Sequence, residues 1–102
     1  MLTYDSVLDA LSDRTRRRIL EELRGSARSV GELTSRLPVS QPAISQHLRV
    51  LREAGLVAPV AEGTRRIYHL SPRGLNTLRE YVDSFWGGVL EAFSDSLAQE
   101  EQ

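Results

Sequence analysis

The sequence SQPAISQHLRVLREAGL, residues 40–56, predicts a single helix with a defined start and end. Ser40 suits the N-cap, because its hydroxyl can accept from the first free backbone N–H groups. Pro42 falls in the first turn, where a missing N–H costs nothing, and Gly55 suits a left-handed turn at the end. Apolar side chains recur at helical spacing on one face of this segment, at Ile44, Leu48 and Leu51. The segment is therefore expected to pack its apolar face on a core.

The other face of this predicted helix carries amides, hydroxyls and guanidiniums, with no acid before Glu53. Its members are Gln41, Ser45, Gln46, Arg49 and Arg52. These side chains can donate to phosphates or hydrogen-bond to base edges, so the helix fits a DNA major groove. The alternative is an ordinary amphipathic helix with a solvated face.

A shorter helix is predicted just before it. Ser29 and Glu32 form a capping-box pattern, and Pro38 disfavours helical geometry at Leu37. Only Pro38 and Val39 then separate this helix from the cap at Ser40. Two helices joined by so short a turn, the second with a polar front, predict a helix-turn-helix over residues 29–54.

The periodicity changes after Gly55. Residues 56–61 and 65–70 read as short strands around a glycine-containing turn, which predicts a hairpin, or wing, over residues 56–70. Pro59 lacks a donor, so its strand should lie at a sheet edge. Arg65 and Arg66 flank the hairpin tip and are expected to contact phosphates, although two adjacent arginines can also serve surface solubility.

Helices are also predicted at both ends of the chain, over residues 4–11, 14–24 and 72–98. Asp13 can cap the second of these, whose arginines either form i,i+4 pairs (Arg17 with Glu21, Arg18 with Glu22) or face a partner's acids or a phosphate backbone. The last helix carries more apolar surface than a small core can cover, which predicts a dimer seam formed by residues 3–11 and 72–98. The expected interface residues are Val7, Leu8, Leu11, Leu78, Val82, Phe85, Trp86, Val89 and Phe93. Gly87-Gly88 is compatible with either a close helix crossing or a kink.

Length and composition indicate one domain, residues 1–102, that is mainly α with a small β-hairpin. The chain has no cysteine, no signal-peptide pattern and no membrane-spanning stretch, so we expect a cytoplasmic protein. All 13 basic residues are arginines and lie within residues 14–79, where only five acids occur, so this span carries +8 of a chain whose net charge is −1. A basic middle between acidic ends suggests a polyanion-binding centre, against the alternative of chance segregation in a short chain. No glycine-rich phosphate loop, cysteine nucleophile or His–acid–Ser constellation indicates an enzyme.

The residues also carry a family resemblance. DRTRRRIL at 13–20, VSQPAISQHLRVLREAGLV at 39–57 and EGTRRIYHL at 62–70 resemble the ArsR family of bacterial winged helix-turn-helix repressors. The resemblance covers nearly the whole chain in the right order, and Arg14 departs from it where many members have proline. It implies a homodimer formed by the first and last helices. It also implies binding to a palindromic operator, usually as a repressor that a signal releases.

Many members of that family sense metals, but the resemblance does not extend to their ligands. The thiolate motif is absent because there is no cysteine, and the last helix has no histidine. His47, in the predicted recognition helix, and His69, in the wing, are a poor metal set by themselves. His47 is expected to help hold a phosphate, and His69 to be a half-buried strand residue. No cofactor is predicted, and the releasing signal stays open between a small molecule, a partner protein and a metal.

The predicted partner is double-stranded DNA. Gln41, Ser45 and Gln46 are the candidates for base edges, since glutamine suits adenine. Phosphate contacts are expected from Ser40, His47, Arg49, Arg52, Arg65 and Arg66. The rival interpretation is a protein-interaction adaptor that binds a different protein through residues 85–97, and a DNA-binding dimer regulated by a partner protein lies between the two.

Overall fold

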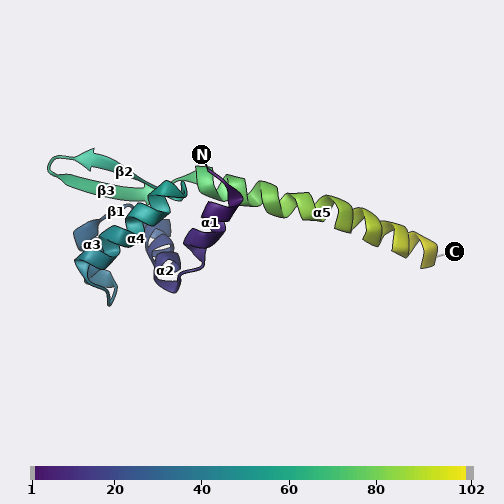
Figure 1. Cartoon of the computed structure of the whole chain (residues 1–102), viewed down its shortest axis with the longest axis horizontal. Coiled ribbons are helices and arrows are strands. Elements are labelled where there is room, and N and C mark those ends of the chain that lie inside the picture. The colour runs from purple at the N-terminus through teal and green to yellow at the C-terminus, as the bar shows by residue number, and fades with distance from the viewer. Residues whose placement is uncertain (1, 101–102) are drawn as a thin grey trace.

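The structure, a computed structural model, describes residues 2–100, which form five helices and a small sheet (Figure 1). In chain order the elements are α1 Tyr4–Leu11, α2 Arg14–Gly25, β1 Arg28–Ser29, α3 Val30–Arg36, α4 Gln41–Glu53, β2 Val57–Glu62, β3 Arg65–Leu70 and α5 Pro72–Glu100. The predicted helix-turn-helix is thus α3 and α4, and the predicted wing is β2 and β3. None of the described helices combines the length and apolar character that crossing a membrane requires.

Helices α1–α4 and the sheet form a head from which α5 projects, as Figure 1 shows. The radius of gyration is 18.4 Å, whereas a compact chain of this length has one of about 13 Å. The difference arises because α5 is 29 residues long and only its first turns lie against the head. Most of α5 therefore has no packing partner among residues 2–100 of the single chain.

The predicted capping residues start the helices. The side chains of Asp13, Ser29 and Ser40 accept from the backbone N–H three residues on, at 3.0, 3.2 and 3.3 Å. Glu32 completes a capping box with Ser29, and α1 has a second one from Thr3 and Ser6. Local side-chain chemistry thus fixes where the helices begin, as the sequence indicates.

The sheet has the antiparallel order β1-β3-β2. β2 lies at an edge, which confirms the expectation from Pro59. The sequence does not predict the third strand of this sheet: α2 ends at Gly25, and Arg28–Ser29 forms β1, paired with Tyr68 and Ile67 of β3. β1 escapes detection because two residues carry no periodicity and this pairing is long-range. It anchors the start of α3 to the wing.

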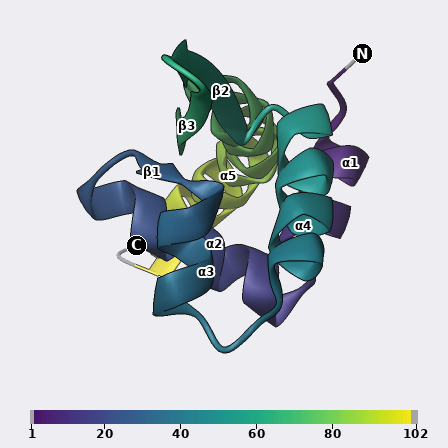
Figure 2. The same cartoon turned by 90° about the vertical axis from the view of Figure 1, so that its left-hand side faces the viewer.

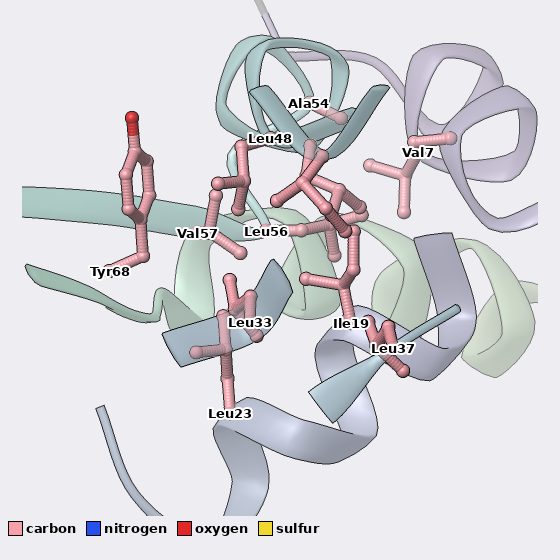
Figure 3. Packing of buried hydrophobic residues seen from close by; sticks show 13 residues of the cluster. Val7, Ile19, Leu23, Leu33, Leu37, Leu48, Ala54, Leu56, Val57 and Tyr68 are labelled. Atoms are coloured by element: carbon pink, nitrogen blue, oxygen red, sulfur yellow. The ribbon is translucent and has the colours of Figure 1, made fainter. Parts of the chain in front are cut away.

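The core lies between the helices of the head and the base of the wing. The fully buried side chains of this core include Ile19, Leu33, Leu48, Leu56 and Val57. Figure 3 shows them converging from α2, α3, α4, β2 and, for Leu56, the turn before β2. The predicted apolar face of α4 is buried as expected, at Ile44, Leu48 and Leu51. Burial of this face fixes the rotation of α4 about its axis, so its polar face must point outward.

Two glycines set the junction between α4, the wing and α5. Gly55 has φ +70, the left-handed conformation that the sequence predicts there. The N–H of Gly74 donates to the carbonyl of Gly55 at 2.8 Å, and a Cβ on Gly74 would collide with the carbonyl oxygen of Ala54. The start of α5 is therefore held directly against the end of α4.

The ion pairs of α2 differ from the prediction. Among the described residues, Glu22 pairs with Arg28 and Arg36, from β1 and α3, rather than with Arg18. The Arg17 guanidinium donates to the carbonyl of Leu11 at 2.7 Å and, within residues 2–100, makes no pair with Glu21. The predicted i,i+4 pairs are therefore wrong for the described residues, because Glu22 pairs with arginines of β1 and α3 and Arg17 donates to a backbone carbonyl. The Arg36 hydrogen bond and the nearby arginine charges lower the pKa of Glu22.

Candidate nucleic-acid interface

The outward face of α4 carries the predicted polar set. Gln41, Ser45, Gln46, Arg49 and Arg52 are all exposed, and Ser40 is exposed at the cap. Figure 2 shows α3 and α4 on the same end of the molecule as the β2–β3 hairpin, opposite the free part of α5. The chain therefore presents one helix and one hairpin on a common side.

A groove of about 700 Å³ runs between α4 and the wing. It is lined by Val30, Ser45, Arg49, Arg52, Glu53, Arg66 and Tyr68. Arg49 and Arg52 come from α4 and Arg66 from β3, so arginines from two elements face one cavity. Glu53 offsets part of this charge, since its Oε1 lies 3.3 Å from Arg49 Nε. Both side chains of that pair are largely exposed, so a phosphate can displace the carboxylate at little cost.

The two wing arginines differ in their surroundings. Gly63 adopts φ +62 in the turn, and Arg65 begins β3 opposite Glu62. Arg65 Nη2 lies 2.8 Å from Glu32 Oε1 on α3, whereas Arg66 has no ion pair among the described residues and lines the groove. The sequence presents the two adjacent arginines as equivalent, but Arg65 is paired with Glu32, whereas Arg66 is available to a ligand in the groove.

His47 does not face outward with the rest of α4. It is half-buried, and its Nδ1 lies 3.5 Å from Arg16 Nη1 on α2. Arg16 also donates to the carbonyls of Ala10 and Asp9, at 2.7 and 3.0 Å. Through Arg16, these contacts connect His47, on the side of α4 that faces α2, with the end of α1. The phosphate contact expected of His47 stays a prediction, and in the single chain the imidazole contacts Arg16.

Asp13 completes this cluster at the start of α2. The backbone N–H of Arg16 donates to its carboxylate, and together with the charges of His47 and Arg16 this lowers the pKa of Asp13. His69 is half-buried in β3, as expected, with Nδ1 3.1 Å from the carbonyl oxygen of Leu70. Within residues 2–100, no three histidine or acidic side chains converge in a way that would hold a metal ion.

An exposed apolar stripe follows α5 away from the head. It comprises Val82, Phe85, Trp86, Val89, Leu90, Phe93 and Leu97. Beside it, Leu8 of α1 is exposed, and Tyr4 stacks on Tyr81 with ring centroids 4.2 Å apart. Apolar surface this extensive on one helix is unusual for a monomer and indicates a protein-binding face.

Three residues of the predicted dimer seam, Val7, Leu11 and Leu78, pack wholly or partly into the core of the single chain. Val7 is fully buried in the core of the single chain, so it leaves no surface for a partner and drops out of the proposed interface. Leu11 and Leu78 are half-buried and pack against the same core. The reason is geometric: an eight-residue helix lying between the head and α5 must turn one face to each.

Two residues that contact predicted site residues are absent from the prediction, namely Glu32, which contacts Arg65, and Arg16, which contacts His47. Glu32 is recognisable from sequence only as a capping residue, and its contact with Arg65 joins positions 33 residues apart. Arg16 lies in an arginine run whose members the sequence does not distinguish. The only sequence feature that could indicate its role is that the arginine run follows the end of α1, where guanidinium groups can donate to free backbone carbonyls.

Comparison with known proteins agrees with this geometry. Residues 13–58 match the family described as bacterial regulatory protein, arsR family. The HTH-type transcriptional regulator Rv2034 of Mycobacterium tuberculosis is 47% identical over 103 residues, covering 98% of this chain and 96% of that protein. The transcriptional activator HlyU of Vibrio cholerae is 42% identical over 76 residues, covering 74% of this chain and 70% of HlyU. The solved structure of an ArsR-like transcriptional regulator from Rhodococcus sp. RHA1 has a TM-score of 0.75 and 38% identity, with 90% of each chain covered.

Proposed function

The chain belongs to the ArsR family and is a DNA-binding transcriptional regulator, and we propose that it acts as a homodimeric repressor on a palindromic operator. The observation that carries this proposal is the placement of the α4 polar face beside a groove into which both α4 and the wing direct arginines. A helix of this kind fits the major groove, while arginines on its flanks suit the phosphates that border it.

The exposed stripe of α5 supports the homodimer. A two-fold axis across this stripe would bury the same apolar side chains on both copies, because such an interface is self-complementary. The two α4 helices would then enter successive major grooves about 34 Å apart. A palindromic operator follows from that symmetry.

Roles within each protomer follow from placement. Gln41, Ser45 and Gln46 lie on the exposed face of α4 and are the proposed base-reading residues. Ser40, Arg49, Arg52 and Arg66 are proposed to hold phosphates, joined by Arg65 once it leaves Glu32. A protein bound to an operator blocks the promoter without a further partner, so repression is the simplest outcome. The protein would act in the bacterial cytoplasm, where the DNA lies.

The proposal is tested by selecting bound duplexes from a random library. The affinity for the selected duplex is then measured by fluorescence anisotropy at several salt concentrations. Q46A is expected to relax sequence preference more than it lowers nonspecific affinity. R65A/R66A is expected to weaken binding to all DNA and to flatten the dependence of log K on log salt, by ~0.9 for each phosphate that is no longer neutralised. R79A is the matched control, since Arg79 lies on α5 and pairs with Asp83 there.

Three results would contradict these assignments. Equal loss of specific and nonspecific binding in Q46A would exclude base reading by Gln46, and unchanged salt slopes would remove the wing from the interface. A chain that stays monomeric and binds no duplex at low salt would favour the adaptor interpretation, in which α5 takes a different protein. In vitro transcription from a promoter containing the selected site then separates repression from activation.

A further inference from the structure

Glu32 is bonded to two elements at once. Its Oε1 accepts from the Ser29 N–H at 3.1 Å and from Arg65 Nη2 at 2.8 Å. The first contact belongs to the capping box of α3, and the second reaches across to the wing. The Ser29 hydrogen bonds, with the charges of Arg65 and Arg28, lower the pKa of Glu32, so the carboxylate is ionised at neutral pH.

This contact lies beside the proposed DNA-binding surface. A shallow hollow of about 270 Å³ between the start of α3 and the wing is lined by Ser29, Val30, Gly31, Arg65 and Arg66. The side chains of Arg65 and Glu32 are 59% and 44% exposed, so water and ions reach the pair. An exposed pair of this kind is weak and can exchange one anionic partner for another.

The cap itself does not require the negative charge. A glutamine at the third helical position serves a capping box as a glutamate does, since either side-chain oxygen can accept from the cap N–H. Keeping a carboxylate at a surface expected to face phosphates therefore has an electrostatic consequence that the helix start does not explain. Arg66 shows the contrast, since it lines the same hollow without an ion pair among the described residues.

We propose that Glu32 is a built-in brake on DNA affinity, which neutralises Arg65 in the free protein and competes with the DNA phosphate for it. This proposal rests on the proposed function. To contact a phosphate, Arg65 must either leave Glu32 or bring the carboxylate close to the polyanion, and each course opposes binding. In this proposal the two wing arginines contribute unequally to DNA binding: Arg66 is free to contact a phosphate, whereas Arg65 must first lose its contact with Glu32.

The test is E32Q, which keeps the cap and removes the charge. Against the selected duplex, E32Q is expected to bind about 1.4-fold to fivefold more tightly per protomer than the unaltered chain, the range expected when an exposed ion pair no longer competes. The slope of log K against log salt should steepen by ~0.9 for each arginine released. E21Q provides the same change of net charge on exposed Glu21 of α2 and should leave affinity unchanged.

A second pair of variants tests the contact itself. In an R65A background, E32Q should lose most of its effect, because the carboxylate then has no arginine to withhold. R65A alone should cost less affinity than R66A. These comparisons use proteins whose circular-dichroism melting curves match that of the unaltered chain.

Unchanged or weaker binding by E32Q would overturn the brake, and weaker binding would instead make Glu32 a residue that orients Arg65. If E32Q still raised DNA affinity in the R65A background, the proposal would also be overturned. The effect would then come from the change in net charge and not from the contact with Arg65. Failure of the unaltered chain to bind any duplex is a different result, because it would remove the proposed function itself.

Discussion

Replacing Phe93 by alanine is expected to weaken the proposed dimer strongly. Phe93 lies in the apolar stripe of α5 and keeps 62% of its surface exposed in the single chain. Complete burial of a phenylalanine side chain is worth about 1.5–3 kcal/mol, so a partner covering the exposed part gains roughly 1–2 kcal/mol. Two-fold symmetry presents the residue twice, which gives a loss of about 2–4 kcal/mol for the dimer.

That loss corresponds to a dimer dissociation constant raised by roughly 30-fold to 1000-fold. Sedimentation equilibrium over a range of protein concentrations measures it directly. E91A is the matched control, because Glu91 is exposed on the same stretch of α5 but lies about 200° around the helix from Phe93. Its dimer constant should stay close to that of the unaltered chain.

Equal dimer constants for F93A and E91A would refute the reasoning, since α5 beyond Trp86 would then bury nothing against a second copy. A monomeric F93A that keeps full affinity for a palindromic duplex would refute a different step. The dimer seam would exist, but it would not hold the two recognition helices in register on DNA.

Four further outcomes are expected. G74A should destabilise the fold by about 1–3 kcal/mol in chemical denaturation, because its Cβ meets the carbonyl of Ala54, whereas G88A, with open space around it, should stabilise α5 by up to about 1 kcal/mol. If G88A instead weakens the dimer in sedimentation, the glycines mark a close helix crossing. The Arg36 hydrogen bond lowers the pKa of Glu22, so the ionised carboxylate stabilises the fold above the usual value of 4.5 and loses this effect as the pH falls through the folded pKa. In E22Q, the free energy of unfolding should therefore depend less on pH in that range. S40A should cost about 1 kcal/mol of stability through loss of the α4 cap, measured by urea denaturation.

The helix boundaries were predictable because their causes are local. A capping side chain contacts a backbone N–H only three residues away, so Asp13, Ser29 and Ser40 mark helix starts without knowledge of the fold. The left-handed turn at Gly55 and the edge position of Pro59 are likewise properties of single residues. The buried face of α4 follows from spacing alone.

The partners of the charged side chains were not predictable, because they join distant parts of the chain. Glu22 has arginines nearby in sequence, yet Arg28 and Arg36 reach it through the packing of α2 against β1 and α3. Arg65 meets Glu32 only because β1 brings the start of α3 beside the wing. Sequence therefore identifies which residues are polar and exposed, but not which of two neighbouring arginines is already engaged.

The contacts of Arg16 bear on how the dimer seam would set the position of the recognition helix. Arg16 bonds the last carbonyls of α1 and touches His47 of α4, while Tyr4 at the other end of α1 stacks on Tyr81 of α5. Helix α1 thus contacts α5 at one end and, at the other end, Arg16 of α2, which in turn contacts His47 of α4. Because packed elements of this kind shift together, the distance between two α4 helices in a dimer would depend on how α1 and α5 pack against the second copy.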